Sequence, residues 1–262
     1  MKEFKVMLNI SHISDTHGRK IAPNKETDLV IVSGDCETTH VKNLTPGYKR
    51  AGIEDAEFVP TSWASWNFRK VDVEKEAAEQ EAQHVNHFIP FLKKRGIDLK
   101  NVIAIPGNHT FCDLTKIYPN AIKKGAKTIM WRGIKIGLLT GVLPLAYEWF
   151  DEITEYDFRQ RILKLDRDIN ILISHTPPYG ILDGYYGTHI GSQELTTAIF
   201  GSKLAELESY FTNLWLHCFG HSHEAHGQKQ FSSEKGYDII FSNAATTKNR
   251  INLDIPDKYF RV

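Results

Sequence analysis

The chain has 262 residues, enough to bury one large core, and its 32 basic and 32 acidic residues cancel to a formal net charge of zero. This balance gives no electrostatic basis for a nucleic-acid-binding or membrane-surface protein. The three cysteines are odd in number and not closely paired, which argues against a disulfide scaffold and fits a reducing compartment.

The first ten residues mix charged and apolar side chains, so they do not form the apolar core of a secretory signal. No apolar run approaches the roughly 20 residues that span a bilayer. We therefore expect a soluble, cytoplasmic protein with no membrane partner.

Short apolar runs that end abruptly in polar residues recur along the chain and are typical of buried strands. In chain order they are residues 6–13, 29–32, 102–105, 134–139, 169–173 and 214–219. Helical patterns lie between them at residues 73–94 and 193–211. This alternation predicts a layered α/β fold, and we expect a single domain over residues 1–262.

Two segments lack a clear period. Residues 37–70 carry Trp63, Trp66 and Phe68 among Thr, Pro and Gly, and we expect an insertion or cap there. Residues 183–192 are rich in Gly and Tyr and predict a long loop.

Polar side chains that can bind metals follow five of the predicted strands. They are Asp15 and His17, then Asp35, then Asn108 and His109, then His175, and last His221 and His223. Loops beyond the carboxyl ends of strands in an α/β sheet converge on one rim, so these side chains can share a site. Glycines precede Asp35, Asn108 and His221, as expected where a chain turns tightly or approaches another backbone closely.

Each motif alone is more often a turn with an incidental histidine than a metal site. All five in this order, each at a strand end, favour a metal site. Mixed imidazole and carboxylate ligands suit a divalent transition metal better than Mg²⁺ or Ca²⁺. His84 and His87 are three residues apart on a predicted helix, but two potential ligands without a third make a weak metal signal.

The order of these motifs resembles the calcineurin-like metallophosphoesterase superfamily over essentially the whole chain. The matching motifs are Asp15-x-His17, Gly34-Asp35, Gly107-Asn108-His109, His175 and Gly220-His221-x-His223. Residues 14–17, 174–183, 220–224 and 241–244 resemble its small metallophosphodiesterase branch, the one related to the brain 239 protein.

The resemblance implies a two-sheet β sandwich flanked by helices, with a dinuclear metal site at one rim. The first metal would be held by Asp15, His17, Asp35 and His223, and the second by Asp35, Asn108, His175 and His221. The cofactors would be two divalent transition metal ions, with Mn favoured over Fe, Zn and Ni. Asp35 would bridge them, a bridging hydroxide would attack phosphorus, and His109 would act on the leaving oxygen.

The chain departs from the protein-phosphatase pattern of this superfamily. No Asp-Arg pair follows Asp35, so the sequence does not identify the group that orients His109, and Glu37 is one candidate. Thr110 also stands where a glutamate is usual. A phosphoprotein substrate is therefore disfavoured, as is a nucleic acid on grounds of charge. Weaker candidates for substrate contacts are Arg19, His189 and His226.

We accordingly expect a metal-dependent phosphodiesterase that hydrolyses a small, nucleotide-like diester, with cyclic nucleotides among the candidates. Two alternatives stay open. One is a broad-specificity phosphomonoesterase with the same dinuclear site, and the other is a non-catalytic scaffold of the same fold.

Overall fold

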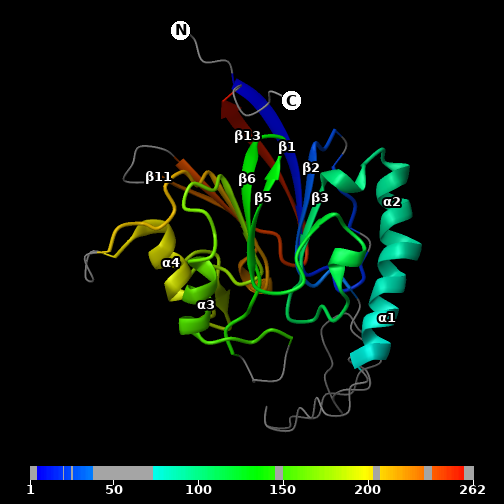
Figure 1. Cartoon of the computed structure of the whole chain (residues 1–262), viewed down its shortest axis with the longest axis horizontal. Helices are drawn as coiled ribbons and strands as arrows, with labels where there is room; N and C mark the ends of the chain where they lie inside the picture. Colours follow the sequence, from blue (N-terminus) through cyan, green and yellow to red (C-terminus); the bar gives the residue numbers. More distant parts are fainter. Residues whose placement is uncertain are drawn as a thin grey trace.

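The computed structural model describes residues 5–19, 21–24, 26–37, 73–144, 150–202, 207–232 and 238–256. Two β-sheets lie face to face, with helices against the outer surface of each (Figure 1). The predicted insertion over residues 37–70 lies outside the described residues except for Glu37.

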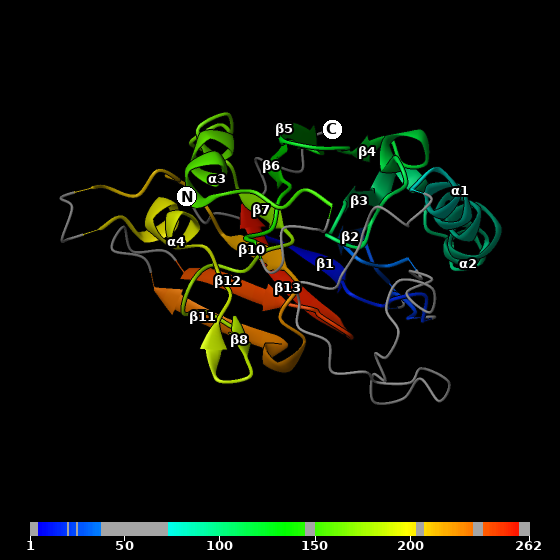
Figure 2. The ribbon, with the colours of Figure 1, turned by 90° about the horizontal axis from the view of Figure 1, so that it is seen from below.

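The first sheet has the strand order β13-β1-β2-β3-β4. The bounds are Lys248–Pro256 for β13, Lys5–Ile13 for β1, Leu29–Ser33 for β2, Val102–Ile105 for β3 and Asn120–Ala121 for β4. Strands β1 to β4 pair in parallel, and β13 pairs antiparallel with β1 along its full length. Figure 2 shows the strands from below.

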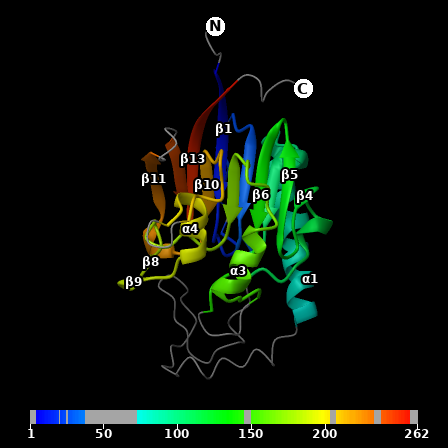
Figure 3. The same cartoon turned by 60° about the vertical axis from the view of Figure 1, so that its left-hand side comes forward.

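The second sheet has the order β11-β12-β10-β7-β6-β5. The bounds are Gly227–Ser232, Asp238–Asn243, Leu216–Phe219, Ile171–Ser174, Ile134–Leu139 and Ala126–Trp131 in that order. The four central strands are parallel, whereas β11 and β5 pair antiparallel with their neighbours. A small hairpin of β8 (Gly184–Tyr185) and β9 (Thr188–His189) lies beside this sheet (Figure 3).

Helices cover both outer faces. Against the first sheet lies one continuous helical segment formed by α1 (Val73–Gln83), the π-helical turn η4 (His84–Phe88) and α2 (Ile89–Lys94). Helices α3 (Glu155–Ile162) and α4 (Gln193–Phe200) lie on the opposite side (Figure 1). Short 3₁₀ turns are η5 (Leu99–Asn101), η6 (Leu114–Lys116) and η7 (His223–Ala225).

Strand β2 illustrates why the central strands have continuous apolar sequences. Leu29 and Ile31 point into the core between the sheets, while Val30 and Val32 pack with Leu92 of α2 on the other face. Side chains alternate across a strand, and both faces of this one are covered, so its first four positions are apolar. Five of its residues in a row are fully buried.

The predicted two-sheet sandwich with flanking helices is confirmed, and all six predicted strands are present. The predicted helix over 193–211 is wrong in length, because α4 ends at Phe200. Gly201 follows with a φ of 78°, an angle that favours glycine, and its amide donates to the Thr197 carbonyl. The predicted loop over 183–192 contains the β8–β9 hairpin. None of the helices in the described part of the chain has the length and hydropathy needed to span a bilayer.

Candidate metal centre

The expected metal ligands all follow parallel strands of the two sheets, and backbone bonds hold the loops that carry them together. The amide of Asp15 donates to the carbonyl of Gly34 at 3.0 Å, and that of His17 donates to the carbonyl of Asp35 at 3.0 Å. Within the second sheet, the amide of Gly220 donates to the carbonyl of His175 at 3.1 Å, and across the sandwich the amide of His221 donates to Asp15 Oδ2 at 2.9 Å. The loops after β1, β2, β7 and β10 therefore meet at one rim, as predicted.

The backbone turns sharply at these positions. Four non-glycine residues of the expected ligand set have positive φ: Asp15 (51°), His17 (46°), Asp35 (52°) and His221 (66°). Such angles are uncommon outside glycine and cluster at functional sites, where surrounding contacts hold them.

Two of the glycines are required by close approach. A Cβ on Gly107 would collide with the carboxylate of Asp35, and a Cβ on Gly220 would collide with Ser14 Oγ and Asp15 Oδ2. The two loops can press against buried carboxylates only because these positions have no side chain.

Asp15, His17 and His223 form one group of facing ligand atoms. His223 Nε2 lies 3.0 Å from Asp15 Oδ1 and 3.4 Å from His17 Nε2. The second oxygen of Asp15 accepts hydrogen bonds from the Ser14 hydroxyl and, at 2.9 Å, from the His221 amide. These bonds fix the carboxylate so that Oδ1 faces the imidazoles.

Asp35, His175 and Asn108 form the second group. His175 Nε2 lies 3.1 Å from Asp35 Oδ2 and 3.1 Å from Asn108 Oδ1. The other ring nitrogen, Nδ1, lies 2.7 Å from the Ser33 carbonyl, to which it donates. This second bond fixes the ring orientation and leaves Nε2 to face the centre, as in metal-ligating histidines generally.

The two groups adjoin each other. His175 Nε2 lies 3.9 Å from Asp15 Oδ1, and the rings of His175 and His221 have centroids 5.0 Å apart. Asp15 is within reach of both groups, whereas Asp35, the expected bridge, belongs to the second. The bridging role of Asp35 therefore stays a prediction.

The electrostatics of the centre favour a bound cation. Burial raises the pKa of Asp15 and of Asp35, but nearby histidines, His175 first, outweigh it and hold both pKa values well below the usual range. Burial lowers the pKa of His175, yet the two carboxylates outweigh it and raise this pKa to about 9. Burial lowers the pKa of His221 to about 3.

These shifts describe two ionised carboxylates that are almost fully buried. Among the described residues, the cationic side chains within ion-pair distance of them are histidines and no Lys or Arg. A buried negative charge needs a compensating positive one. A divalent transition metal would supply that charge, and oxygen and imidazole donors at such short separations are the ligands that it prefers. The residues present therefore fit the implied ions.

His109 is held at the edge of this centre. Its backbone amide donates to Asp35 Oδ1 at 2.7 Å, and its ring lies edge-on to that of His17, with centroids 5.3 Å apart. Glu37, the candidate orienting group, does not fill that role, because its carboxylate binds His84 and Thr110 instead.

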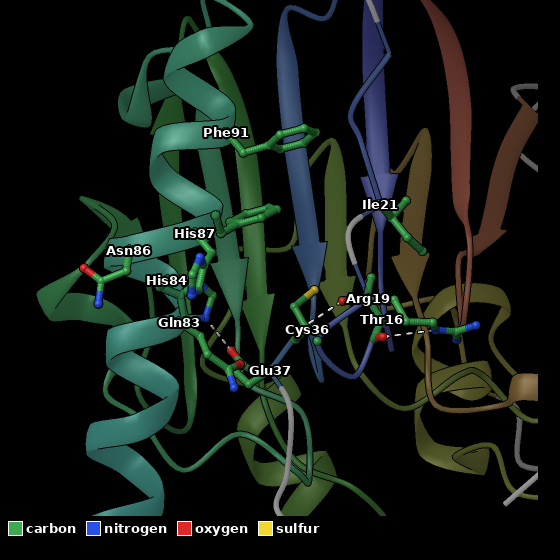
Figure 4. Close-up of a pocket in the computed structure, with 12 residues that line it drawn as sticks. Thr16, Arg19, Ile21, Cys36, Glu37, Gln83, His84, Asn86, His87 and Phe91 are labelled. Carbon is green, nitrogen blue, oxygen red and sulfur yellow. Dashed lines mark hydrogen bonds and ion pairs between the residues drawn. The ribbon is translucent and has the colours of Figure 1, made fainter. Parts of the chain in front are cut away.

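The three weaker candidates lie farther out. Arg19 donates from Nε to the Thr16 carbonyl at 3.2 Å and lines a cavity of about 500 Å³ (Figure 4). His189 binds Asp183 at 2.8 Å and is half exposed. His226 is exposed, and its Nδ1 lies 3.3 Å from the carbonyl of His223. Their roles stay predictions.

The sequence did not predict that four polar residues lie buried together beside the centre. They are Glu37, Gln80, His84 and Thr110. A signal for two of them is present in the helix. Gln80 and His84 continue, at four-residue spacing, to the apolar Phe88 and Leu92, so they lie on the face that meets the sheet. In a helix of 3.6 residues per turn, positions four residues apart rotate gradually away from one face. The π turn adds a residue to one turn and so keeps these side chains on the face toward the sheet.

The sequence pattern of the calcineurin-like phosphoesterase family matches residues 8–225. No match was found among curated proteins.

Three solved structures match this chain at low sequence identity. NAD nucleotidase (NadN) of Haemophilus influenzae is 12% identical, with 96% of this chain and 48% of that chain covered and a TM-score of 0.44. A putative 5'-nucleotidase from Staphylococcus aureus is 13% identical, with 97% and 52% covered and a TM-score of 0.46. The calcineurin-like phosphoesterase YfkN from Bacillus subtilis is 12% identical, with 96% and 91% covered and a TM-score of 0.38. The chain spans about half the length of the first two.

Proposed function

This chain belongs to the calcineurin-like phosphoesterase family, and on that premise we propose that it is a metal-dependent phosphodiesterase acting on a small, nucleotide-like diester. The family places it among hydrolases of phosphate esters. The preference for diesters, the identity of the metals and the roles of single residues are the proposal. Its assignment to the small metallophosphodiesterase branch also stays a prediction.

The observation that carries the proposal is the pair of adjoining ligand groups around Asp15 and Asp35. Asp15, His17, Asp35 and His223 would hold one ion, and Asp35, Asn108, His175 and His221 would hold the other. When bound, two divalent ions lower the pKa of water and neutralise charge on a phosphoryl group. Mn²⁺ is the favoured ion, with Fe, Zn and Ni as alternatives.

Residues of the chain itself contribute orientation and a proton. The hydrogen bond that His175 Nδ1 donates to the Ser33 carbonyl keeps the ring fixed, and the bond that the His109 amide donates to Asp35 keeps that carboxylate fixed. These groups are held in position before substrate binds, so little reorganisation is needed during reaction. We assign to the His109 side chain the donation of a proton to the leaving oxygen.

The preference for diesters rests on charge. A monoester is dianionic and needs strong cationic clamping, whereas a diester carries one negative charge. The sequence lacks the Asp-Arg pair that follows the corresponding aspartate in protein phosphatases. A site with fewer cationic side chains is therefore better suited to a diester.

The experiment is a comparison of bis-p-nitrophenyl phosphate with p-nitrophenyl phosphate, with Mn²⁺ supplied. We expect faster hydrolysis of the diester. Faster hydrolysis of the monoester would favour the phosphomonoesterase alternative, and metal binding without hydrolysis of either would favour the scaffold alternative.

A further inference from the structure

We infer that a network of four buried residues outside the ligand set positions the metal centre from the side of helix α1. The four residues are Glu37, Gln80, His84 and Thr110. The inference rests on the proposed function, because it takes Asp35 as a metal ligand and His109 as the proton donor.

Glu37 is the middle of this network. It is 2% exposed, and its two oxygens bind partners on opposite sides. Oε1 lies 2.7 Å from His84 Nε2, and Oε2 lies 2.8 Å from Thr110 Oγ1. Figure 4 shows the His84 ring reaching from the helix toward Glu37, which follows β2.

The Thr110 hydroxyl connects Glu37 to the loops that carry the expected ligands. Two backbone amides point at its oxygen, that of Gly107 at 3.1 Å and that of Asp35 at 3.3 Å. A hydroxyl has two lone pairs and one proton. Because the amides occupy the lone pairs, the proton goes to a carboxylate, and Glu37 Oε2 at 2.8 Å is much nearer than Asp35 Oδ1 at 3.4 Å.

The direction of the remaining bonds follows. His84 donates from Nε2 to Glu37, and its Nδ1 accepts from the Tyr118 hydroxyl at 2.8 Å. Burial raises the pKa of Tyr118, so this hydroxyl keeps its proton and can donate. Each hydrogen-bond donor in the series from Tyr118 through His84, Glu37 and Thr110 to the Asp35 amide thus has an acceptor. A buried polar network rigidifies a site under this condition.

Gln80 provides a second connection from the same helix face. Its amide nitrogen donates to the carbonyl of His109 at 2.8 Å, and its Oε1 accepts from the amides of Phe111 (2.7 Å) and Cys112 (3.1 Å). The loop after β3 is therefore held by Gln80 on one side and by Asp35, through the His109 amide, on the other.

A further metal ion at this place is the competing explanation, because ligand atoms of Glu37, His84 and Cys112 lie within 4.8 Å of one another. The distances favour hydrogen bonding. The separation of 2.7 Å between His84 and Glu37 is shorter than the 3.0 and 3.1 Å between histidine and carboxylate in the candidate centre. Burial, first, and Glu37, second, also raise the pKa of Cys112 and keep its thiol protonated.

The test uses Thr110→Val, which keeps the shape of the side chain and removes the hydroxyl, and Thr110→Ser, which restores it. Asn170→Ala is the matched control, because Asn170 is buried and hydrogen-bonded but lies before β7, at the opposite end of that strand from His175. Mn²⁺ affinity of metal-stripped protein, metal equivalents per chain and diester turnover are measured for each, at a temperature where circular dichroism shows native structure.

Loss of an outer-shell partner costs about 10- to 100-fold in metal affinity. We expect that loss in Thr110→Val, recovery to within a few-fold in Thr110→Ser, and unchanged affinity in Asn170→Ala despite a lower melting temperature. If Thr110→Val does not fold, Glu37→Gln takes its place with the same expected loss.

Wild-type Mn²⁺ affinity in the folded Thr110→Val variant would overturn the network. So would a metal equivalent that is lost in Cys112→Ser while the remaining equivalents stay bound, because Cys112 would then be a metal ligand. Failure of the proposed function gives a different result. Wild-type protein would then bind Mn²⁺ without hydrolysing either ester, and the affinities of the variants would still decide the network.

Discussion

The backbone amide of His109 donates a hydrogen bond of 2.7 Å to Oδ1 of Asp35. The proposed proton donor and the proposed bridging ligand are thus joined through the main chain. Because the bond does not use the imidazole, a change of the His109 side chain can remove a proton donor while leaving the Asp35 carboxylate in place. The two residues can therefore be tested separately.

We expect Asp35→Asn to reduce diester turnover by at least about 10²-fold and to lower metal content together with it, because a neutral amide compensates the ions less well than a carboxylate. Elemental analysis and steady-state rates check this. Asp15→Asn is the comparison, since Asp15 lies within reach of both ligand groups. If Asp35→Asn keeps both ions and its activity while Asp15→Asn loses them, the bridge is Asp15.

We expect His109→Ala to slow hydrolysis of a cyclic nucleotide by on the order of 10² or more, and that of bis-p-nitrophenyl phosphate by less. A ribose hydroxyl is a poor leaving group that needs a proton, whereas p-nitrophenolate is stable as an anion. The ratio of the two losses is the measurement. Equal losses on both substrates would remove His109 as the proton donor.

The expected ligands could be found from the sequence because each follows a buried strand, and parallel strands bring their carboxyl ends to one rim. A residue that directly follows one of these strands is therefore expected at that rim. Asp35 and His175, 140 residues apart, are therefore predicted neighbours, and their side chains lie 3.1 Å apart.

The residues around the ligands could not be found in the same way. Gln80 and His84 share a helix face with the apolar Phe88 and Leu92, but both are polar, and their burial depends on a π turn that the sequence does not signal. Thr110 appears only as a departure from the family pattern. Its role depends on where Glu37 lies, and that follows from tertiary packing.

We expect acid to destabilise the fold partly through His217. Its Nε2 donates to Ser174 Oγ at 2.8 Å, because that hydroxyl gives its proton to the Thr176 carbonyl. Its buried Nδ1 has no hydrogen-bond partner in the described part of the chain. Burial therefore lowers the pKa of His217 from 6.5 to about 3, since a proton on Nδ1 would be a buried charge.

The contribution of neutral His217 to the free energy of unfolding is fully present above pH 6.5, and it is lost as pH falls toward about 3 because the unfolded chain then binds the proton more readily. Between pH 6.5 and 4.5 the loss is roughly 2–3 kcal/mol. Urea unfolding of wild type and His217→Gln at several pH values measures it. The variant should lose less unfolding free energy over this range, and identical slopes would contradict the assignment.

We expect Gly220→Ala to disturb the Asp15 group, because the added methyl would meet Ser14 Oγ and Asp15 Oδ2. Metal content should fall, and so should the melting temperature. Gly184→Ala is the control, since the nearest atom to its added methyl is 4.0 Å away, in ordinary contact distance. Equal metal content in the two variants would show that the loop after β10 tolerates a side chain.

The most direct test of the central claim is a titration of metal-stripped protein with Mn²⁺ while hydrolysis of bis-p-nitrophenyl phosphate is followed. The centre described here has two adjoining ligand groups around Asp15 and Asp35. We therefore predict an inactive stripped protein whose activity rises fully only as the second equivalent of Mn²⁺ binds. Full activity in the stripped protein, or complete activity at one equivalent, would contradict a two-metal phosphodiesterase.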